Sequence, residues 1–307
     1  MRDALSGNVF TIDPSGNFLE ILVNSLIDGT LVEGFVPSDD PFLLSEATIF
    51  VPSRRAARAL VAQFSEAFDG KPVLLPSIFT LGDAPEEDFG IANSKSEFED
   101  LPEEIGALEK KLQLTKMVLS WLDAMSEETR RLYSDEDIII PSSHADAIKL
   151  ADDLSQLLDQ VVQEEVSWQT IQEIVPEDHA QWWQLTLTFL AIITDVWPGF
   201  LEEQNLLDPS LRSAMQLEER TRRYIENGST GPVIVAGSTG SVPSTQRLLD
   251  AVAKLEKGAV VLPGVDWMLS NPEWENLTNA KLELDASIET HPQFGLARLL
   301  EIGRAHV

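Results

Sequence analysis

Two short apolar runs constrain the fold more than any other feature of this sequence. Residues 231–237 read GPVIVAG and residues 258–262 read GAVVL, and neither run alternates apolar with polar residues. A strand with one face in water alternates, whereas a central strand of a parallel sheet is covered by helices on both faces and reads as a continuous β-branched run. The two runs therefore predict an α/β protein with a parallel sheet.

Strand, loop and helix follow one another twice in the first third of the chain. Residues 8–12 (NVFTI) are predicted to form a strand that leads through a short loop into the helical pattern FLEILVNSLI. Residues 47–64 (ATIFVPSRRAARALVAQF) repeat this arrangement, with a Pro-Ser turn between strand and helix. Residues 73–76 (VLLP) are predicted to be a third strand, with residues 77–83 as its exit loop.

The middle of the chain has a different pattern. From residue 102 to residue 227 apolar residues recur at intervals of three and four, which predicts a series of helices. An acidic stretch at residues 84–100, poor in aliphatic residues, predicts a flexible link before them. We therefore expect three parts: residues 1–100 as the first part of an α/β domain, residues 101–228 as an all-helical insertion, and residues 229–307 as the second part of that domain and the start of a following region.

An aromatic group within the helical region has two interpretations. Exposed aromatic side chains form stacking platforms for bases, whereas aromatic residues at helical spacing line a helical core. The spacing favours the core. The group consists of Trp182, Trp183, Phe189, Trp197 and Phe200.

The charge of the chain restricts its partners. Lys and Arg number 22 against 51 Asp and Glu, which gives a formal net charge of -29 at pH 7. Because non-specific nucleic-acid affinity comes mainly from neutralising phosphates, a chain this acidic repels nucleic acids at long range. Any contact with a nucleic acid must therefore be local, or be shared with a more basic partner.

Three arginines within five residues stand out against this acidic background. Arg54, Arg55 and Arg58 follow Ser53 at a turn from strand to helix. Doubly wound sheets bind ligands where their strands end, so these four residues are candidates for contacts to nucleic-acid phosphates. The alternative is a solvent-exposed helix face that pairs with nearby carboxylates.

A second candidate phosphate-binding loop follows the run at residues 231–237. Ser238 and Thr239 offer hydroxyls and backbone N–H groups that can hold a phosphate. The alternative is an ordinary capped turn, with Ser244 as the N-cap or a first-turn residue of the next helix.

The loop at Pro14, Ser15, Gly16 and Asn17 lies where an α/β chain would carry a phosphate-binding loop. A P-loop reads G-x-x-x-x-G-K-[ST], in which the lysine reaches the phosphates and the hydroxyl holds magnesium. This loop has one glycine and no lysine, and Phe18 follows where the charge should be. We interpret it as a degenerate phosphate loop, with the geometry of a P-loop and without its chemistry.

No catalytic residue, metal site or cofactor is expected from the remaining sequence. Cysteine is absent, which excludes thiolate ligands and cysteine nucleophiles in this chain and fits a reducing compartment. The four histidines lack metal-ligand spacing. The N-terminus has no signal-peptide pattern, and no run of about 18 apolar residues occurs, so we expect a cytoplasmic protein without a membrane segment.

Several phrases of the sequence resemble one family. They are VPSRRAARAL, VLLPSIFTLGD, VIVAGSTGSVPSTQRLLDAVAKLEKGAVVLPGVD and HPQFGL. With the helical region between the second and the third, they resemble the N-terminal part of the AddB subunits of bacterial AddAB helicase-nucleases, of the alphaproteobacterial type, from about Asn8 to Leu296. The resemblance implies a superfamily 1 helicase-like fold, in which a RecA-like parallel sheet is interrupted by a helical subdomain.

The resemblance also implies roles for the candidate residues. Pro14 to Phe18 stand where active helicases carry the Walker A loop, and Ser53 to Arg58 are similar to motif Ia, which contacts single-stranded DNA. Gly237 to Pro243 are similar to the segment after the Walker B strand, but the strand itself, VIVAGS, lacks the Asp-Glu pair that holds magnesium. The carboxylate–lysine cluster of the family's C-terminal nuclease domain is not found in this sequence. The resemblance therefore implies an inactivated motor.

The leading hypothesis is a non-catalytic, helicase-like scaffold that contacts DNA within a double-strand break repair complex. Its implied partners are DNA and an AddA-type motor and nuclease subunit, with which it forms a heterodimer. One alternative is an enzyme, a nucleotide-binding α/β protein with a divergent phosphate loop. Another is a pure protein-interaction module whose helical region docks a partner. The final pattern, FGLARLLEIGRAHV, has no closing element, as expected for a fragment of a longer protein.

Overall fold

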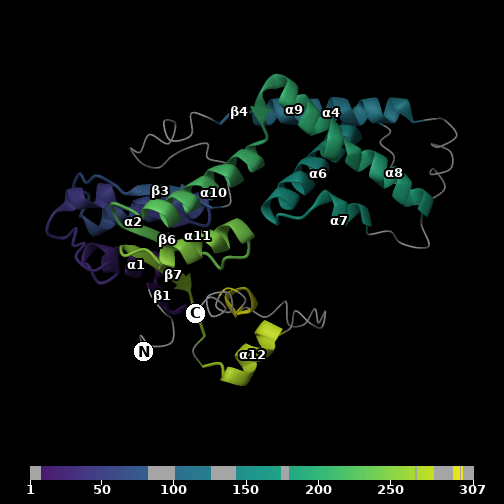
Figure 1. Cartoon of the computed structure of the whole chain (residues 1–307). Helices are drawn as coiled ribbons and strands as arrows, with labels where there is room; N and C mark the ends of the chain where they lie inside the picture. Colours follow the sequence, from purple (N-terminus) through teal and green to yellow (C-terminus); the bar gives the residue numbers. More distant parts are fainter. Residues whose placement is uncertain are drawn as a thin grey trace. The chain divides into compact units, whose positions relative to one another are not determined.

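The computed structural model describes residues 8–81, 101–125, 143–173, 180–266, 268–279, 293–297 and 299. The chain divides into two compact units (Figure 1). Unit 1 combines Met1–Glu97 with Met215–Val307, and unit 2 is Phe98–Ala214. The predicted acidic link at residues 84–100 lies outside the described residues.

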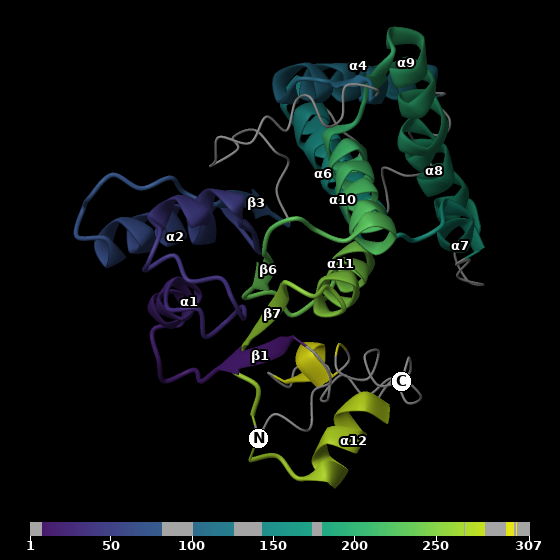
Figure 2. The same ribbon diagram turned by 60° about the vertical axis from the view of Figure 1, so that its left-hand side comes forward.

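Unit 1 is built on a five-stranded sheet in which every strand runs parallel to its neighbours. The predicted α/β class with a parallel sheet is therefore confirmed. The strand order is β1-β7-β6-β2-β3, and Figure 2 shows β1, β7 and β6 side by side. The strands are β1 (Val9–Ile12), β2 (Thr48–Val51), β3 (Ser77–Thr80), β6 (Val233–Ala236) and β7 (Gly258–Pro263).

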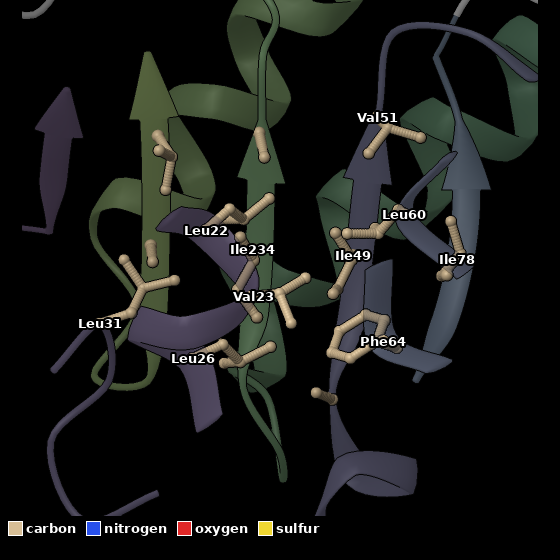
Figure 3. Packing of buried hydrophobic residues seen from close by; sticks show 14 of the residues in the cluster. Leu22, Val23, Leu26, Leu31, Ile49, Val51, Leu60, Phe64, Ile78 and Ile234 are labelled. Atoms are coloured by element: carbon tan, nitrogen blue, oxygen red, sulfur yellow. The ribbon is translucent and has the colours of Figure 1, made fainter. Parts of the chain in front are cut away.

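Helices cover both faces of this sheet. On one face lie α1 (Phe18–Ile27) and α2 (Arg54–Ala67), which pack through a shared apolar cluster (Figure 3). On the other face lie α11 (Pro243–Ala253) and the C-terminal part of α10 (Pro209–Asn227). Because both faces are covered, all four residues of β6 are buried, as the continuous apolar run predicted.

The residues of β2 show how one strand serves both layers. Ile49 and Val51 point toward α1 and α2, where they pack near Leu60 and Phe64 of α2 (Figure 3). Phe50, between them in sequence, belongs to the cluster on the opposite face with Leu248. Successive side chains of a strand point to opposite faces, so a fully buried strand must be apolar at every position.

The third strand differs from the prediction. The strand was expected at residues 73–76, but β3 is Ser77–Thr80, within the segment predicted as a loop. Pro72 precedes the expected run and Pro76 ends it, and proline has no N–H to donate to a sheet. The strand therefore begins after Pro76, where Ser77 N–H donates to the carbonyl of Ala47 at 3.0 Å.

Shorter elements complete unit 1. A 3₁₀ helix, η1 (Pro41–Glu46), leads into β2, and its first turn is capped by Asp40, which accepts the N–H of Phe42 at 3.0 Å. Helix α12 (Asn271–Asn279) follows β7. Leu296 and Ala297 are buried, and Leu296 packs in the apolar cluster that includes Leu248 of α11.

Unit 2 consists mainly of helices with their own core. Leu114, Val118, Leu154 and Ile193 are among its buried residues. Two short strands, β4 (Glu103–Glu104) and β5 (Leu206–Leu207), pair in parallel beside the helices. The helical elements are α4 (Ala107–Ala124), α6 (His144–Gln163), α7 (Trp168–Glu173), α8 (Ala180–Ala191), the π-helical turn η2 (Ile192–Val196), α9 (Trp197–Gln204) and the start of α10.

The aromatic residues that the structure describes here pack inside unit 2. Trp197 is 1% exposed and stacks on Phe200, with ring centroids 5.6 Å apart. Phe189 packs against Trp121, with ring centroids 5.0 Å apart. The core interpretation is thus confirmed for Trp197, whereas the side chains of Trp182 and Trp183 lie outside the described residues.

One helical stretch of unit 2, Leu185–Gln204, is long and apolar enough to cross a membrane, with a mean hydropathy of 1.3. Length and composition alone are weak grounds for a membrane span, because core helices meet the same criteria. Here Ile193, Trp197 and Leu201 of this stretch belong to the core of unit 2.

Candidate nucleic-acid interface

Every candidate residue of unit 1 follows the carboxyl end of a strand. The loop at residues 14–17 follows β1, Ser53 and the three arginines follow β2, and Ser238 with Thr239 follow β6. Because the strands are parallel, these ends share one edge of the sheet. Strands β2 and β6 are direct neighbours, with Phe50 opposite Val235, whereas β7 separates β1 from β6.

The edge between β2 and β6 is a topological switch point. The chain leaves β2 into α2 on one face of the sheet, and it leaves β6 into α11 on the opposite face. The two loops therefore diverge, and in open α/β sheets this is the position at which ligands bind. Sequence reasoning placed both candidate loops at strand ends, and the structure makes them neighbours.

The start of α2 is held by Ser53. Its hydroxyl accepts the N–H of Ala56 at 3.3 Å, the usual N-cap contact. Arg54 is half-buried and has a contact of its own. Arg55 and Arg58 are exposed, three residues apart on one face of the helix. The Ser53 hydroxyl is therefore occupied as the N-cap of α2. Positive charge that an anion could reach comes from Arg55 and Arg58.

Ion pairing bears on the two interpretations of Arg55 and Arg58. Within the described part of the chain, neither of them forms an ion pair. Among the described residues, these two side chains face solvent as the alternative interpretation expects, without the carboxylate pairing that it also expects. Ion pairs do engage Lys110, Lys111, Arg222, Arg223, Arg247 and Lys254.

Positive charge at this end of a helix is unfavourable by itself. The N-terminus of a helix carries a partial positive charge, so cations there cost about 0.3–1 kcal/mol each at an exposed site. The first turn of α2 contains no acidic residue to offset this. Arg55 lies in this first turn and Arg58 in the second, so an anion bound beside Arg55 would relieve part of the repulsion.

The loop after β6 is shaped by glycines. Gly237 has a φ of 78°, a left-handed conformation that residues with a side chain rarely adopt. Its Cα faces Phe18 and Pro52, because a Cβ at residue 237 would lie 3.5 Å from Cε1 of Phe18 and 3.7 Å from Cδ of Pro52. Ser238 accepts the N–H of Gly240 on its hydroxyl at 3.2 Å. The loops after β1, β2 and β6 therefore meet around Gly237.

The loop after β1 is closed by hydrogen bonds to Asp13, the residue that precedes it. Asp13 Oδ1 accepts the backbone N–H of Ser15 at 2.8 Å and the hydroxyl of Ser15 at 2.5 Å, and the carbonyl of Asp13 accepts the N–H of Gly16 at 3.0 Å. These hydrogen bonds from the Ser15 hydroxyl and N–H lower the pKa of Asp13, so it stays ionised at neutral pH. The groups that would cradle a phosphate already bind a carboxylate.

The sequence analysis assigned no role to Asp13 or to Gln293, which lies within the phrase HPQFGL, and both hold loops at this edge in the described part of the chain. The Gln293 amide donates to the carbonyl of Gly264 at 3.0 Å and accepts the N–H of Asp266 at 3.1 Å, so it fixes the loop after β7. The Asp-x-Ser spacing is a recognisable signal for the turn at Asp13. The phrase HPQFGL contains Gln293 but gives no sign of its partner, because Gly264 lies 29 residues away in sequence.

No protein-family model matches the chain, and no curated protein sequence matches it. Family membership therefore stays a proposal, and the proposed function depends on the residues at the sheet edge. Among the described residues, no group of three or more His, Cys, Asp or Glu side chains is arranged to hold a metal ion. What the edge offers chemically is two exposed guanidinium groups on α2 and a hydroxyl-rich loop after β6.

Proposed function

We propose that the chain is a non-catalytic, helicase-like scaffold that contacts DNA within a double-strand break repair complex, as the resemblance to AddB subunits implies. Its fold would be RecA-like, with unit 2 as a helical insertion. Two observations support this: the parallel sheet is covered on both faces, and unit 2 interrupts unit 1 between Glu97 and Met215.

The observation that carries the proposal is the pair Arg55 and Arg58. They are exposed, have no ion-pair partner among the described residues, and follow a strand that ends at a switch point. Arginine is the preferred side chain for phosphate because its planar guanidinium donates two parallel hydrogen bonds. Phosphate contacts position a protein on DNA without reading sequence.

The closed loop after β1 supports the non-catalytic part of the proposal. A nucleotide phosphate would have to displace the Asp13 carboxylate from Ser15, and the two anions would repel each other. This observation speaks against the alternative of a nucleotide-using enzyme with a divergent phosphate loop.

Charge supports a role inside a complex. With a net charge of -29, the free chain should bind DNA weakly at physiological salt. Docking on a more basic AddA-type subunit would offset the repulsion and bring the arginines of α2 to the DNA backbone.

The test compares Arg55→Ala/Arg58→Ala with the wild type in the heterodimer, by titration of labelled single-stranded DNA at several salt concentrations. Loss of two phosphate contacts should weaken binding and reduce the salt slope by about 1.4. Arg222→Ala is the matched control, because Arg222 is already paired with Glu219 and Glu226. If the DNA affinity and its salt slope were unchanged in the double variant, Arg55 and Arg58 would not contact phosphates. Tight DNA binding by the chain alone at physiological salt would contradict the need for a partner.

A second candidate function, a protein-interaction module, is favoured by α4. Leu108 and Leu112 are 71% and 53% exposed on one face of this helix. Exposed leucines one turn apart are typical of helices that dock on a partner. Leu108→Ser/Leu112→Ser should weaken assembly with the partner if unit 2 docks it. Normal DNA binding by the Arg55→Ala/Arg58→Ala heterodimer would then favour this function over the first.

A further inference from the structure

The segment around Gly295 is attached to the loop after β7 by a side chain. This segment, residues 293–297 and 299, is called the strap below and is the unlabelled yellow turn in Figure 2. The side-chain amide of Gln293 donates to the carbonyl of Gly264 at 3.0 Å and accepts the N–H of Asp266 at 3.1 Å. Within the strap, the N–H of Ala297 donates to the carbonyl of Gln293 at 2.8 Å, which closes one helical turn.

The strap also lies against the loop after β6. A Cβ at Gly295 would lie 3.6 Å from Cβ of Thr239 and 3.7 Å from its hydroxyl oxygen, so the strap backbone packs against this side chain. A Cβ at Gly240 would lie 2.8 Å from Cδ1 of Leu299, closer than a real Cβ approaches another atom, so Leu299 lies directly over the Gly240 backbone. Gly240 is buried and Thr239 is half-buried, whereas the next residue, Ser241, is exposed.

This packing affects one of the two candidate phosphate contacts of the loop, Thr239. A phosphate oxygen that accepts a hydroxyl hydrogen bond comes within about 3 Å of the hydroxyl oxygen. The backbone at Gly295 already occupies space next to that oxygen. The strap and a DNA backbone therefore compete for the surface of this loop, whereas Arg55 and Arg58 on α2 are exposed.

The attachment of the strap is small compared with that of the strands. Backbone ladders join β7 to β1 and to β6. In the described part of the chain, the hydrogen bonds between the strap and the loop after β7 come from the side chain of Gln293. The buried residues of the strap are Leu296 and Ala297, and Leu296 packs in the cluster that includes Leu248. Because segments with few hydrogen bonds and few buried residues open at a lower free energy than a core, the strap should open before the sheet unfolds.

We propose that the strap is an autoinhibitory contact. In the free chain it covers Thr239 and Gly240, Gln293 holds it closed, and the loop after β6 reaches a DNA phosphate only when the strap opens. The part that concerns DNA rests on the proposed function, whereas the closed strap and the role of Gln293 do not. Closure of the strap gives the weak DNA binding expected of the free chain a second cause beside its negative charge.

The first experiment measures closure of the strap in the free chain. The sequence contains no cysteine, so Thr239→Cys and Ser241→Cys each introduce a single thiol, whose alkylation by iodoacetamide is timed relative to the same variant in urea. Thr239→Cys should react at least about tenfold more slowly than Ser241→Cys.

The same measurement tests the role of Gln293. Gln293→Ala removes two hydrogen bonds and should accelerate alkylation of Thr239→Cys by about tenfold, with the Ser241→Cys rate unchanged. Gln63→Ala on α2 is the matched control and should change neither rate. Equal rates for the two thiols, or a Thr239→Cys rate that does not respond to Gln293→Ala, overturn the proposal.

A second experiment locks the strap reversibly. The 3.6 Å between Cβ of Thr239 and a Cβ at residue 295 suits a disulfide, so Thr239→Cys/Gly295→Cys should crosslink on mild oxidation. In the heterodimer, the oxidised variant should bind labelled single-stranded DNA about fivefold more weakly than the same protein after reduction, because the loop's remaining donors stay covered. Thr239→Cys alone is the control, and its affinity should not change with the oxidant.

The Arg55→Ala/Arg58→Ala heterodimer separates failure of this inference from failure of the proposed function. Equal affinities of the oxidised and reduced forms, in a heterodimer whose affinity does depend on the two arginines, reject the strap as an inhibitor. Equal affinities together with no effect of the arginine substitutions reject the proposed DNA contacts themselves. Slow alkylation of Thr239→Cys that Gln293→Ala relieves supports the closed strap in either case.

Discussion

The ammonium group of Lys110 lies 3.0 Å from Oδ2 of Asp208, inside unit 2. Both side chains are almost fully buried, with exposed fractions of 8% and 4%. The same carboxylate accepts the indole N–H of Trp197 at 3.0 Å and the N–H and hydroxyl of Ser210, at 3.1 Å and 2.8 Å. Asp208 thereby ties α4, α9 and the start of α10 together.

Removal of the Lys110 charge should strongly destabilise unit 2. Lys110→Met leaves the Asp208 carboxylate buried without its cation, and breaking a buried pair in this way costs about 3–5 kcal/mol. Lys111→Met is the matched control, because the Lys111–Asp152 pair is over 40% exposed on both sides and should contribute less than about 1 kcal/mol. Urea unfolding followed by tryptophan fluorescence measures both. Equal midpoints for the two variants would contradict the structural role of the buried pair.

Two glycine-to-alanine substitutions should act in opposite directions. At Gly258 a Cβ would collide with the backbone carbonyl of Val252 and lie 3.0 Å from Cβ of Leu255, so Gly258→Ala should destabilise unit 1 by about 3 kcal/mol. At Gly199, within α9, nothing lies within 4 Å of an added Cβ, so Gly199→Ala should stabilise unit 2 by about 0.5–1 kcal/mol. Thermal unfolding of each variant checks the sign, and a stable Gly258→Ala protein would show that β7 can move away from α11.

The pKa of Glu219 should respond to its arginines. Hydrogen bonds from Arg222, followed by those from Arg223, hold it below the usual value. Because the pKa of Glu219 is lower in the folded protein, its contribution to stability is fully present above the unfolded pKa of about 4.3. The contribution is lost as the pH falls through the folded pKa. Arg222→Ala should raise the Glu219 pKa toward its ordinary range. Carboxyl ¹³C NMR titration of both proteins measures it, and an unmoved titration curve would mean that Arg222 does not hold Glu219 in solution.

Nucleotide should not bind at the loop after β1. Calorimetric titration with ATP and magnesium is expected to give no binding that depends on Ser15 or Asn17, because the N–H and hydroxyl of Ser15 already donate to Asp13. Ser15→Ala/Asn17→Ala is therefore expected to behave as the wild type does. Magnesium-dependent binding that disappears in this double variant would restore the enzyme hypothesis.

The sequence was sufficient for the parts of the fold that rest on local pattern. Continuous apolar runs located β6 and β7, and the Pro-Ser turn located the start of α2. The third strand was misplaced, because VLLP is more hydrophobic than SIFT and only the prolines argue against it. The prediction thus followed the hydrophobicity of residues 73–76 and gave too little weight to the N–H groups that the prolines lack.

The site was predictable only in outline. The pattern showed that Arg54, Arg55 and Arg58 follow a strand, but it did not show that Arg54 would be engaged while the other two are exposed. Contacts between distant residues have no local signal: Lys110 and Asp208 are 98 residues apart in sequence. Their meeting depends on how α4 packs, which periodicity does not encode.

The turn at Asp13 brings its own anion to the start of α1. The carboxylate that accepts the N–H and hydroxyl of Ser15 belongs to the polypeptide itself, so its local concentration is fixed and these hydrogen bonds need no ligand. The turn that leads into α1 is therefore formed by the chain's own groups.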